Sequence, residues 1–318
     1  MTGLKKELVS VIVPCYNEEE SLPIFYNEFV KMTEKLDADY ELILVDDGSS
    51  DNTYSIFCDL SKKDKNIKYY SFSRNFGKEA AMCCGLRNAS GEYACFMDAD
   101  LQDPPHLLPE MLGILRSGKY DSVATRRKNR DGEPIIRSFF AKKFYQIINR
   151  ISDAEIVDGA RDYRLMNRKM VDAIISMTEY NRFSKGIFGW VGFKTYWLSY
   201  ENIERTAGCT KWSFWGLTKY AISGIINFST VPLDLASVFG FFMTFVSFVF
   251  LIIIIVRRLI FGDPVAGWAS TMCVIIFMGG VQLFSIGVLG QYLGKTYMET
   301  KNRPVYIISK TNDEKENK

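Results

Sequence analysis

The segment YACFMDADLQDPP, residues 93–105, places three carboxylates within six positions directly after an apolar run. The run has the composition of a buried strand, and Asp98 and Asp100 follow it at i and i+2. Two carboxylates so placed repel each other unless a cation lies between them, and paired oxygen ligands favour Mg²⁺ or Mn²⁺ with phosphate oxygens completing the coordination. We therefore expect a metal clamp for a diphosphate here. A pair of solvated turn aspartates is the alternative.

The third carboxylate of this segment, Asp103, precedes Pro104, Pro105 and a helical run over residues 106–115. An acidic side chain in this position commonly caps a helix whose first turn contains proline, so Asp103 is predicted to be an N-cap. His106, the only histidine, is predicted to lie on the surface of that helix.

Strand and helix patterns alternate through residues 1–130. The predicted strands are residues 9–13, 40–45, 67–72 and 92–97, and the predicted helices are residues 21–36, 50–60 and 78–87. This order predicts an α/β fold, a mostly parallel sheet with flanking helices, in which ligands bind at the carboxyl ends of the strands. A polar cluster follows each strand: Tyr16-Asn17-Glu18, Asp46-Asp47-Gly48-Ser49, Arg74-Asn75 and Asp98-Ala99-Asp100.

Composition and short motifs exclude several classes of protein. The formal net charge is +2, so overall charge gives no sign of a nucleic-acid partner. The seven cysteines form no CxxC pair, which favours reduced thiols in a cytosol over a disulfide framework or a zinc site. The sequence contains neither a GxxxxGK[ST] loop nor GxGxxG after a strand. Neutralisation of a phosphate is therefore left to a metal.

Two long stretches without a charged residue, 235–256 and 268–293, lie in the last third of the chain. Each is long enough to cross a hydrocarbon core about 30 Å thick, so they predict a hairpin of two transmembrane helices. A buried helix pair in a soluble core is the alternative. Basic residues after the second stretch and the reduced cysteines favour a cytoplasmic catalytic domain, whereas Arg257 and Arg258 oppose this orientation.

These patterns predict the domain organisation. We expect a catalytic domain over 1–210, an amphipathic interfacial segment over 211–233, the hairpin over 234–294 and a cytoplasmic tail over 295–318, disordered from Thr311 onward. The segment 137–151 has an apolar stripe beside basic residues, which fits either a membrane surface or core packing. Glycines in the second stretch would allow close helix contact, as in a homo-oligomer such as a tetramer.

Six motifs in order carry a resemblance to one family: VSVIVPCYNEEESL, ILVDDGSSDNT, SRNFGKEAA, FMDADLQDPP, VDGARDYRLMNRK and RTAGCTKWSFW. They resemble the family-2 glycosyltransferases of fold type A (GT-A), within them the polyprenyl-phosphate group that includes dolichol-phosphate mannose synthase and bactoprenol glucosyltransferase. The resemblance implies an inverting enzyme of the inner cell membrane. It would transfer a hexose, with UDP-glucose as the expected donor, to undecaprenyl phosphate and so make a lipid-linked sugar for cell-envelope glycosylation.

The resemblance also assigns site residues. The nucleotide-sugar set is Pro14, Tyr16, Glu18, Asp47, Arg74, Lys78, Asp98, Arg205 and Lys211. The metal set is Asp98, Asp100 and Gln102, and the lipid-phosphate set is Arg126 and Arg137. The structural alternatives are a helix start for Tyr16 and Glu18 and solvated surface positions for Arg126, Arg137, Arg205 and Lys211.

The family's acidic catalytic residue falls within DGARDYR, residues 158–164, where we expect Asp162 rather than Asp158. An acceptor phosphate is already ionised at neutral pH, so Asp162 is expected to orient the acceptor or the sugar more than to act as a base. The alternative for Asp162 is a structural ion pair with Arg161 or Arg164.

The sequence opposes two alternatives to lipid-phosphate glycosylation. A processive polysaccharide synthase of the same superfamily would carry a QxxRW-like segment and more membrane spans, and neither is found in the sequence. A non-catalytic membrane scaffold is opposed by the intact Asp98, Asp100 and Asp162.

Overall fold

The computed structural model describes residues 6–127, 157, 159–200, 226, 229–261 and 267–313. The chain divides into two compact units. One unit contains Met1–Ala221 and Arg303–Lys318, and the other contains Ile222–Asn302.

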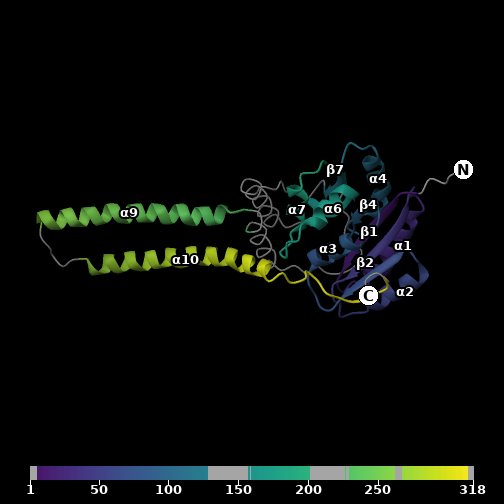
Figure 1. The fold of residues 1–318 in the computed structure, drawn as a ribbon, viewed down its shortest axis with the longest axis horizontal. Helices are drawn as coiled ribbons and strands as arrows, with labels where there is room; N and C mark the ends of the chain where they lie inside the picture. Colours follow the sequence, from purple (N-terminus) through teal and green to yellow (C-terminus); the bar gives the residue numbers. More distant parts are fainter. Residues whose placement is uncertain are drawn as a thin grey trace. The chain divides into compact units, whose positions relative to one another are not determined.

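The described part of the first unit contains an eight-stranded sheet in the order β7-β5-β6-β4-β1-β2-β3-β8 (Figure 1). Its strands are β1 Leu8–Cys15, β2 Asp39–Asp46, β3 Ile67–Phe72, β4 Tyr93–Phe96, β5 Ser122–Arg127, β6 Ala160–Asn167, β7 Thr195–Tyr200 and β8 Ile308–Thr311. The run β3-β2-β1-β4 is parallel, as is the pair β5-β7, while β6 and β8 are antiparallel to their neighbours. The predicted α/β fold with a mostly parallel sheet is confirmed.

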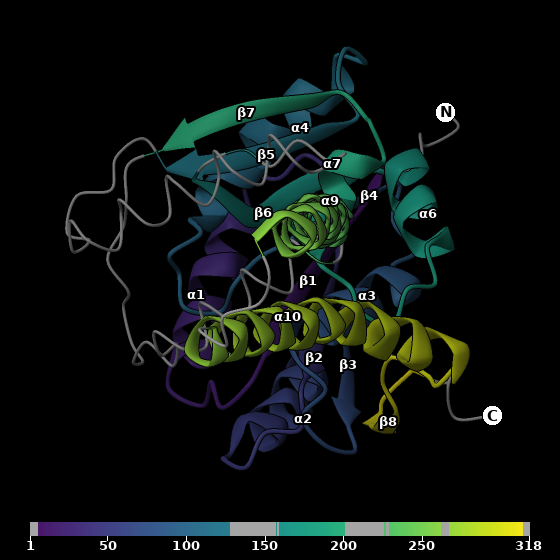
Figure 2. The same cartoon turned by 90° about the vertical axis from the view of Figure 1, so that its left-hand side faces the viewer.

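Helices connect these strands and cover the sheet (Figure 2). They are α1 Ser21–Thr33, α2 Thr53–Lys63, α3 Lys78–Asn88, η1 Pro105–Leu107, α4 Leu108–Arg116, α6 Arg168–Ser176 and α7 Ser184–Trp190. Alternate residues of β1 serve both faces of the sheet: Val11 belongs to the core cluster that contains Phe25 and Phe29 of α1, whereas Ile12 meets α3. At Gly85 of α3 a Cβ would lie 2.1 Å from Ile12 Cγ2, so this helix lies unusually close to the sheet.

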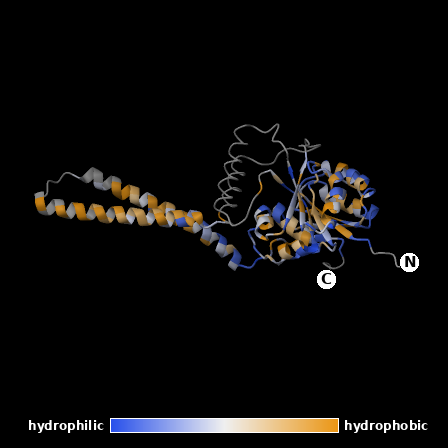
Figure 3. Ribbon diagram, turned by 90° about the horizontal axis from the view of Figure 1, so that it is seen from above, coloured by the Kyte–Doolittle hydropathy of each residue, from blue (hydrophilic) through white to orange (hydrophobic). Residues whose placement is uncertain are grey.

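The second unit contains two long helices, α9 Val231–Phe261 and α10 Trp268–Thr300. Windows of mean hydropathy 1.9 and 1.8, over Val231–Phe250 and Val274–Thr300, make both long and apolar enough to cross a membrane. In Figure 3 the coloured parts of both helices are mainly hydrophobic by residue hydropathy. None of either window is buried, which is unlike a helix pair in a soluble core.

The chain after α10 belongs to the first unit, where β8 pairs antiparallel with the edge strand β3. The prediction of disorder from Thr311 onward is wrong for Thr311, Asn312 and Asp313. Asn312 accepts from the Tyr69 N–H at 2.8 Å, and Asp313 accepts from the Tyr70 hydroxyl. Backbone groups along an exposed strand edge provide partners that composition does not reveal. Residues 314–318 are not described.

Two predicted membrane-surface segments fall largely on undescribed parts of the chain. The segment 137–151 is wholly among them. Of 211–233, the structure describes only residue 226 and residues 229–233.

Gly48, which follows β2, allows two loops to approach each other. Its φ is +69°, and a Cβ there would lie 2.4 Å from the backbone carbon of Arg74. We expect Gly48→Ala to destabilise the first unit by about 1–3 kcal/mol from backbone strain, with a further loss from the clash. Thermal unfolding of the purified chain measures this.

Gly113 in α4 provides the matched control, because nothing lies within 4 Å of its added Cβ. Gly113→Ala should stabilise by about 0.5–1 kcal/mol, since alanine favours a helix interior. Equal effects of the two substitutions would contradict the role given to Gly48.

Candidate functional site

The polar clusters predicted after β1 and β2 lie together in the structure. The Asn17 N–H donates to Ser49 Oγ at 2.9 Å, and the Glu18 N–H donates to Thr53 Oγ1 at 2.9 Å. Because β1 and β2 are parallel, their carboxyl ends meet at one edge of the sheet. Pro14 lies within β1, Tyr16 is exposed, and Glu18 accepts from the Ser21 hydroxyl at the start of α1.

Asp47 connects this edge to the loop after β3. The residue is 3% exposed, and its carboxylate accepts from the N–H groups of Phe76 at 2.6 Å and Gly77 at 2.9 Å. Burial raises the pKa of Asp47 to about 6, although these two donors act in the opposite direction. The guanidinium of Arg74 lies 4.0 Å from the centre of the Phe76 ring. Asp47 therefore holds the loop that contains Arg74 and leads into α3.

Lys78, the first residue of α3, brings two distant carboxylates together. Its Nζ lies 2.7 Å from Asp98 Oδ1 and 2.8 Å from Asp162 Oδ2. The strand register explains the meeting. Phe96 of β4 pairs with Arg164 of the antiparallel strand β6, so Asp98, two residues after Phe96, comes level with Asp162, two residues before Arg164. The ion pair of Asp162 is thus with Lys78.

The charges of this cluster stabilise one another. Burial alone would raise the pKa of Asp162, but the ammonium groups of Lys78 and Lys185 outweigh burial and hold that pKa well below its usual range. Burial alone would lower the pKa of Lys78, and the carboxylates of Asp162 and Asp98 raise it above its ordinary value. Asp162 and Lys78 are therefore both ionised at neutral pH.

The predicted metal segment presents oxygen atoms on a tight turn. Leu101 has a φ of +59°, and Asp100 Oδ1 accepts from the Gln102 N–H at 3.1 Å. In the described residues no group of three or more His, Cys, Asp or Glu side chains could hold a metal ion. Asp98, Asp100 and Gln102 nevertheless offer the oxygen donors that Mg²⁺ or Mn²⁺ prefers, and Mg²⁺ commonly binds one or two carboxylates together with substrate phosphates. The donor set fits a metal bound with a diphosphate.

Arg161 braces this segment from β6, a role that the sequence did not reveal. Its Nε donates to Asp103 Oδ1 at 3.1 Å, and its Nη2 donates to Gln102 Oε1 at 3.2 Å. The predicted N-cap role of Asp103 is wrong, because this buried carboxylate accepts from Arg161 and from the Tyr200 hydroxyl instead. Burial raises the pKa of Asp103 to about 6 against the opposing charge of Arg161. In the sequence, the only sign that Arg161 contributes to the site is its position next to Asp162.

Glu79 attaches α7 to α3. Its carboxylate accepts from the Ser184 N–H at 2.9 Å and from the Ser184 hydroxyl. Ser184 begins α7. The next residue, Lys185, helps Lys78 to lower the pKa of Asp162. Neither Glu79 nor Lys185 was predicted from the sequence, since each depends on a contact between segments about 100 residues apart.

Of the remaining predicted residues, the structure describes Arg126 and His106, and it shows neither in contact with this cluster. Arg126 is exposed on β5, and its Nε donates to Ser199 Oγ on β7 at 2.9 Å. His106 is exposed, as predicted. The structure does not describe Arg137, Asp158, Arg205 or Lys211.

The comparisons with known proteins agree with this arrangement. Residues 10–175 match the model of the family described as glycosyl transferase family 2. The chain belongs to this family. The resemblance seen in the motifs is confirmed, and the protein is an enzyme, a glycosyltransferase.

Relatives match the chain over nearly its whole length. The bactoprenol glucosyl transferase of Shigella phage SfII is 41% identical over 95% of this chain and 98% of its own. CsbB of Bacillus subtilis (strain 168), described as a glycosyltransferase, is 40% identical over 97% of this chain and 93% of its own. Among solved structures, mannosyl-3-phosphoglycerate synthase from Rubrobacter xylanophilus has a TM-score of 0.48 and 18% identity, covering 69% of this chain and 72% of that chain.

Removal of the Lys78 ammonium should leave two carboxylates facing each other. We expect Lys78→Met to lower the free energy of unfolding by about 1–3 kcal/mol, between the values for exposed and buried pairs, and to abolish activity. Lys78→Arg should retain most of the stability. In the double variant Lys78→Met/Asp162→Asn the repulsion is relieved, so thermal stability should recover while activity does not. A double variant as unstable as Lys78→Met alone would refute the proposed charge balance.

Glu79 should make stability depend on pH. Burial raises its pKa to about 7 from an ordinary 4.5, against the opposing Ser184 donors. The folded chain therefore retains a proton that the unfolded chain releases, and this contribution to stability is lost as pH rises from about 4.5 to about 7. The melting temperature of Glu79→Gln should fall less than that of the parent over this range. Glu110→Gln, at an exposed site in α4, is the control, and identical slopes for all three chains would count against the assignment.

Proposed function

We propose that this glycosyltransferase transfers a hexose from a nucleotide diphosphate sugar to the phosphate of a polyprenol, with UDP-glucose and undecaprenyl phosphate as the substrates. The observation that carries the proposal is the pair Asp98 and Asp162 on one ammonium, at the sheet edge where a nucleotide sugar binds in α/β folds. The full-length match to bactoprenol glucosyl transferases supports the lipid acceptor, because it includes the two apolar helices.

The proposed reaction inverts the configuration of the sugar. A phosphate oxygen of the acceptor attacks the anomeric carbon, the bond from that carbon to the nucleoside diphosphate breaks, and the diphosphate leaves from the opposite face. Because the low pKa of Asp162 makes it a weak base, we assign it, with Lys78, to orienting the acceptor or the sugar. The ionised acceptor phosphate needs no proton removed.

Asp98, Asp100 and Gln102 would hold the divalent metal, Mg²⁺ or Mn²⁺. When bound, the ion neutralises charge on the departing diphosphate. The brace from Arg161 to Gln102 and Asp103 supports this assignment, because it fixes the turn that presents these oxygen atoms.

Other residues have proposed binding roles. We place Pro14, Tyr16, Glu18, Asp47 and Arg74 around the nucleotide, with Asp47 acting through the loop it holds. Arg205 and Lys211 are proposed to close over the diphosphate. Arg126 and Arg137 are proposed to bind the lipid phosphate, for which the arginine fork is suited.

The proposed setting is the inner cell membrane, as a multi-pass protein. We assign α9 and α10 as the transmembrane hairpin, residues 1–210 as the cytoplasmic catalytic domain and 211–233 as the interfacial segment. We propose a homo-oligomer such as a tetramer as the assembly. Such a setting suits an acceptor whose phosphate stays at the membrane surface.

Sugar transfer by the purified full chain in detergent tests the function. With Mg²⁺, UDP-glucose and undecaprenyl phosphate it should give a glucosylated lipid, and chelation of the metal or Asp98→Asn should lower the rate about 100-fold or more. Asp59→Asn, at an exposed ion pair with Lys62 in α2, is the matched control and should be fully active. A chain that glycosylates no polyprenyl phosphate, or an Asp98→Asn variant at parental rate, would reject the proposal.

A further inference from the structure

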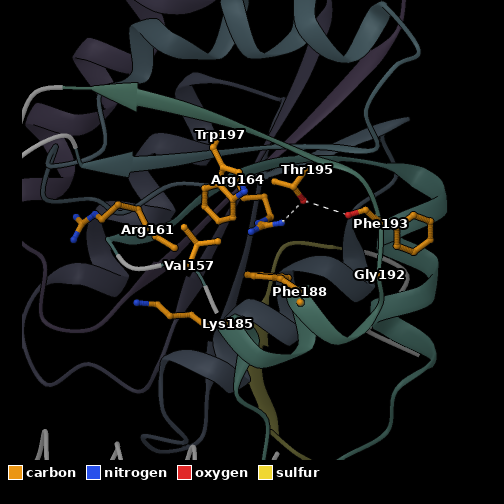
Figure 4. Close-up of a pocket in the computed structure, with 11 residues that line it drawn as sticks. Val157, Arg161, Arg164, Lys185, Phe188, Gly192, Phe193, Thr195 and Trp197 are labelled. Carbon is orange, nitrogen blue, oxygen red and sulfur yellow. Dashed lines mark hydrogen bonds between the residues drawn. The ribbon is translucent and has the colours of Figure 1, made fainter. Parts of the chain in front are cut away.

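A cavity of about 280 Å³ lies in the first unit between β6, β7 and α7 (Figure 4). Of the described residues that line it, three are basic, Arg161, Arg164 and Lys185, and none is acidic. Two of its basic residues flank Asp162 on β6. The cavity therefore lies beside the catalytic cluster, yet nothing in the function derived so far uses its inner part.

Arg164 lines this cavity and is only 4% exposed. Its Nη1 donates to the hydroxyls of Ser122 at 3.1 Å and Thr195 at 3.2 Å. Among the described residues, nothing accepts a hydrogen bond from its buried Nε. A buried donor without an acceptor is costly, so this N–H indicates a missing partner.

The charge of Arg164 is already partly compensated by aromatic rings. Its guanidinium carbon lies 4.5 Å from the centre of the Phe188 ring and 5.4 Å from that of Trp197, within the range of cation–π attraction. Figure 4 shows the guanidinium among the side chains of Thr195, Trp197 and Phe188. What this group lacks is therefore a hydrogen-bond acceptor more than a counter-ion, and a hydroxyl oxygen would be sufficient.

Arg161 connects the cavity to the diphosphate segment. The same side chain that lines the cavity donates to Gln102 and Asp103. In Figure 4, Arg161 and Lys185 extend toward the same side of the cavity. A group attached to a diphosphate at Asp98 and Asp100 thus has this cavity next to it, lined by cations and by aromatic rings.

We propose that this cavity is the subsite for the transferred hexose, in which the Arg164 Nε–H donates to a ring hydroxyl and Phe188 and Trp197 face the apolar surface of the sugar. The volume is near the lower end for ligand pockets, which suits a single sugar ring. The inference rests on the proposed function and deepens it, since it names residues that select the sugar.

Binding of UDP-glucose and of UDP, each with Mn²⁺ and without acceptor, tests the subsite. The parent chain should bind UDP-glucose more tightly than UDP. Arg164→Lys keeps the charge but removes the Nε–H, and it should weaken UDP-glucose binding about ten- to a hundredfold while leaving the Kd of UDP within about twofold. Arg168→Lys, which changes an exposed ion pair with Asp172, should alter neither Kd.

Trp197→Leu is a second test should the buried Arg164 variant fail to fold. It should weaken UDP-glucose binding about tenfold, again without changing the Kd of UDP. Tyr196→Leu, the next residue on β7, packs against Tyr120 with ring centres 5.3 Å apart and does not line the cavity, so it is the matched control.

Three outcomes would overturn the subsite. The parent chain could bind both ligands equally, the variants could weaken UDP and UDP-glucose in parallel, or they could raise only the KM for undecaprenyl phosphate, which would assign the cavity to the acceptor. The Kd measurements with UDP-glucose and UDP need no acceptor. A failure of sugar transfer to the lipid would therefore reject the proposed function without being confused with failure of the subsite.

Discussion

The contact of one ammonium group with two carboxylates is the interaction on which the site depends. Lys78 lies within 3 Å of both Asp98 and Asp162, which reach it from different strands. Without a cation, two acidic groups at the edge of the sheet would repel each other. The position of Lys78 in turn depends on α3, whose first turn follows the loop held by Asp47 and whose Gly85 packs against β1. The charge balance of the site therefore depends on the packing of α3 against the sheet.

Much of the fold could be predicted because it is local in origin. The strand β3 has the predicted bounds, and β2 and β4 differ from prediction by one residue at each end, since runs of apolar residues between turn signals define buried strands well. The edge where Asp98 lies followed from a general rule, that parallel strands present their carboxyl ends together. The apolar lengths of α9 and α10 were likewise evident from composition.

The rest could not be predicted, because it depends on contacts between distant segments. Arg161 was a candidate ion-pair partner of Asp162, yet it pairs with Asp103. Asp103 in turn was predicted to cap a helix. Lys185, whose charge acts on Asp162, follows Ser184, which binds Glu79. The strand β8 lies in the tail after α10, where backbone hydrogen bonding to β3 determines the structure and side-chain composition does not. In each case a partner more than 50 residues away decides the outcome.

The most direct test of the account is the location of the metal. A crystal of the full chain grown with Mn²⁺ and UDP-glucose would show the ion by its anomalous scattering. The account predicts the ion against the side chains of Asp98 and Asp100, in contact with the diphosphate, with Lys78 still beside Asp162. An ion bound elsewhere, with both aspartates turned away from the nucleotide and Lys78 unmoved between Asp98 and Asp162, would contradict it.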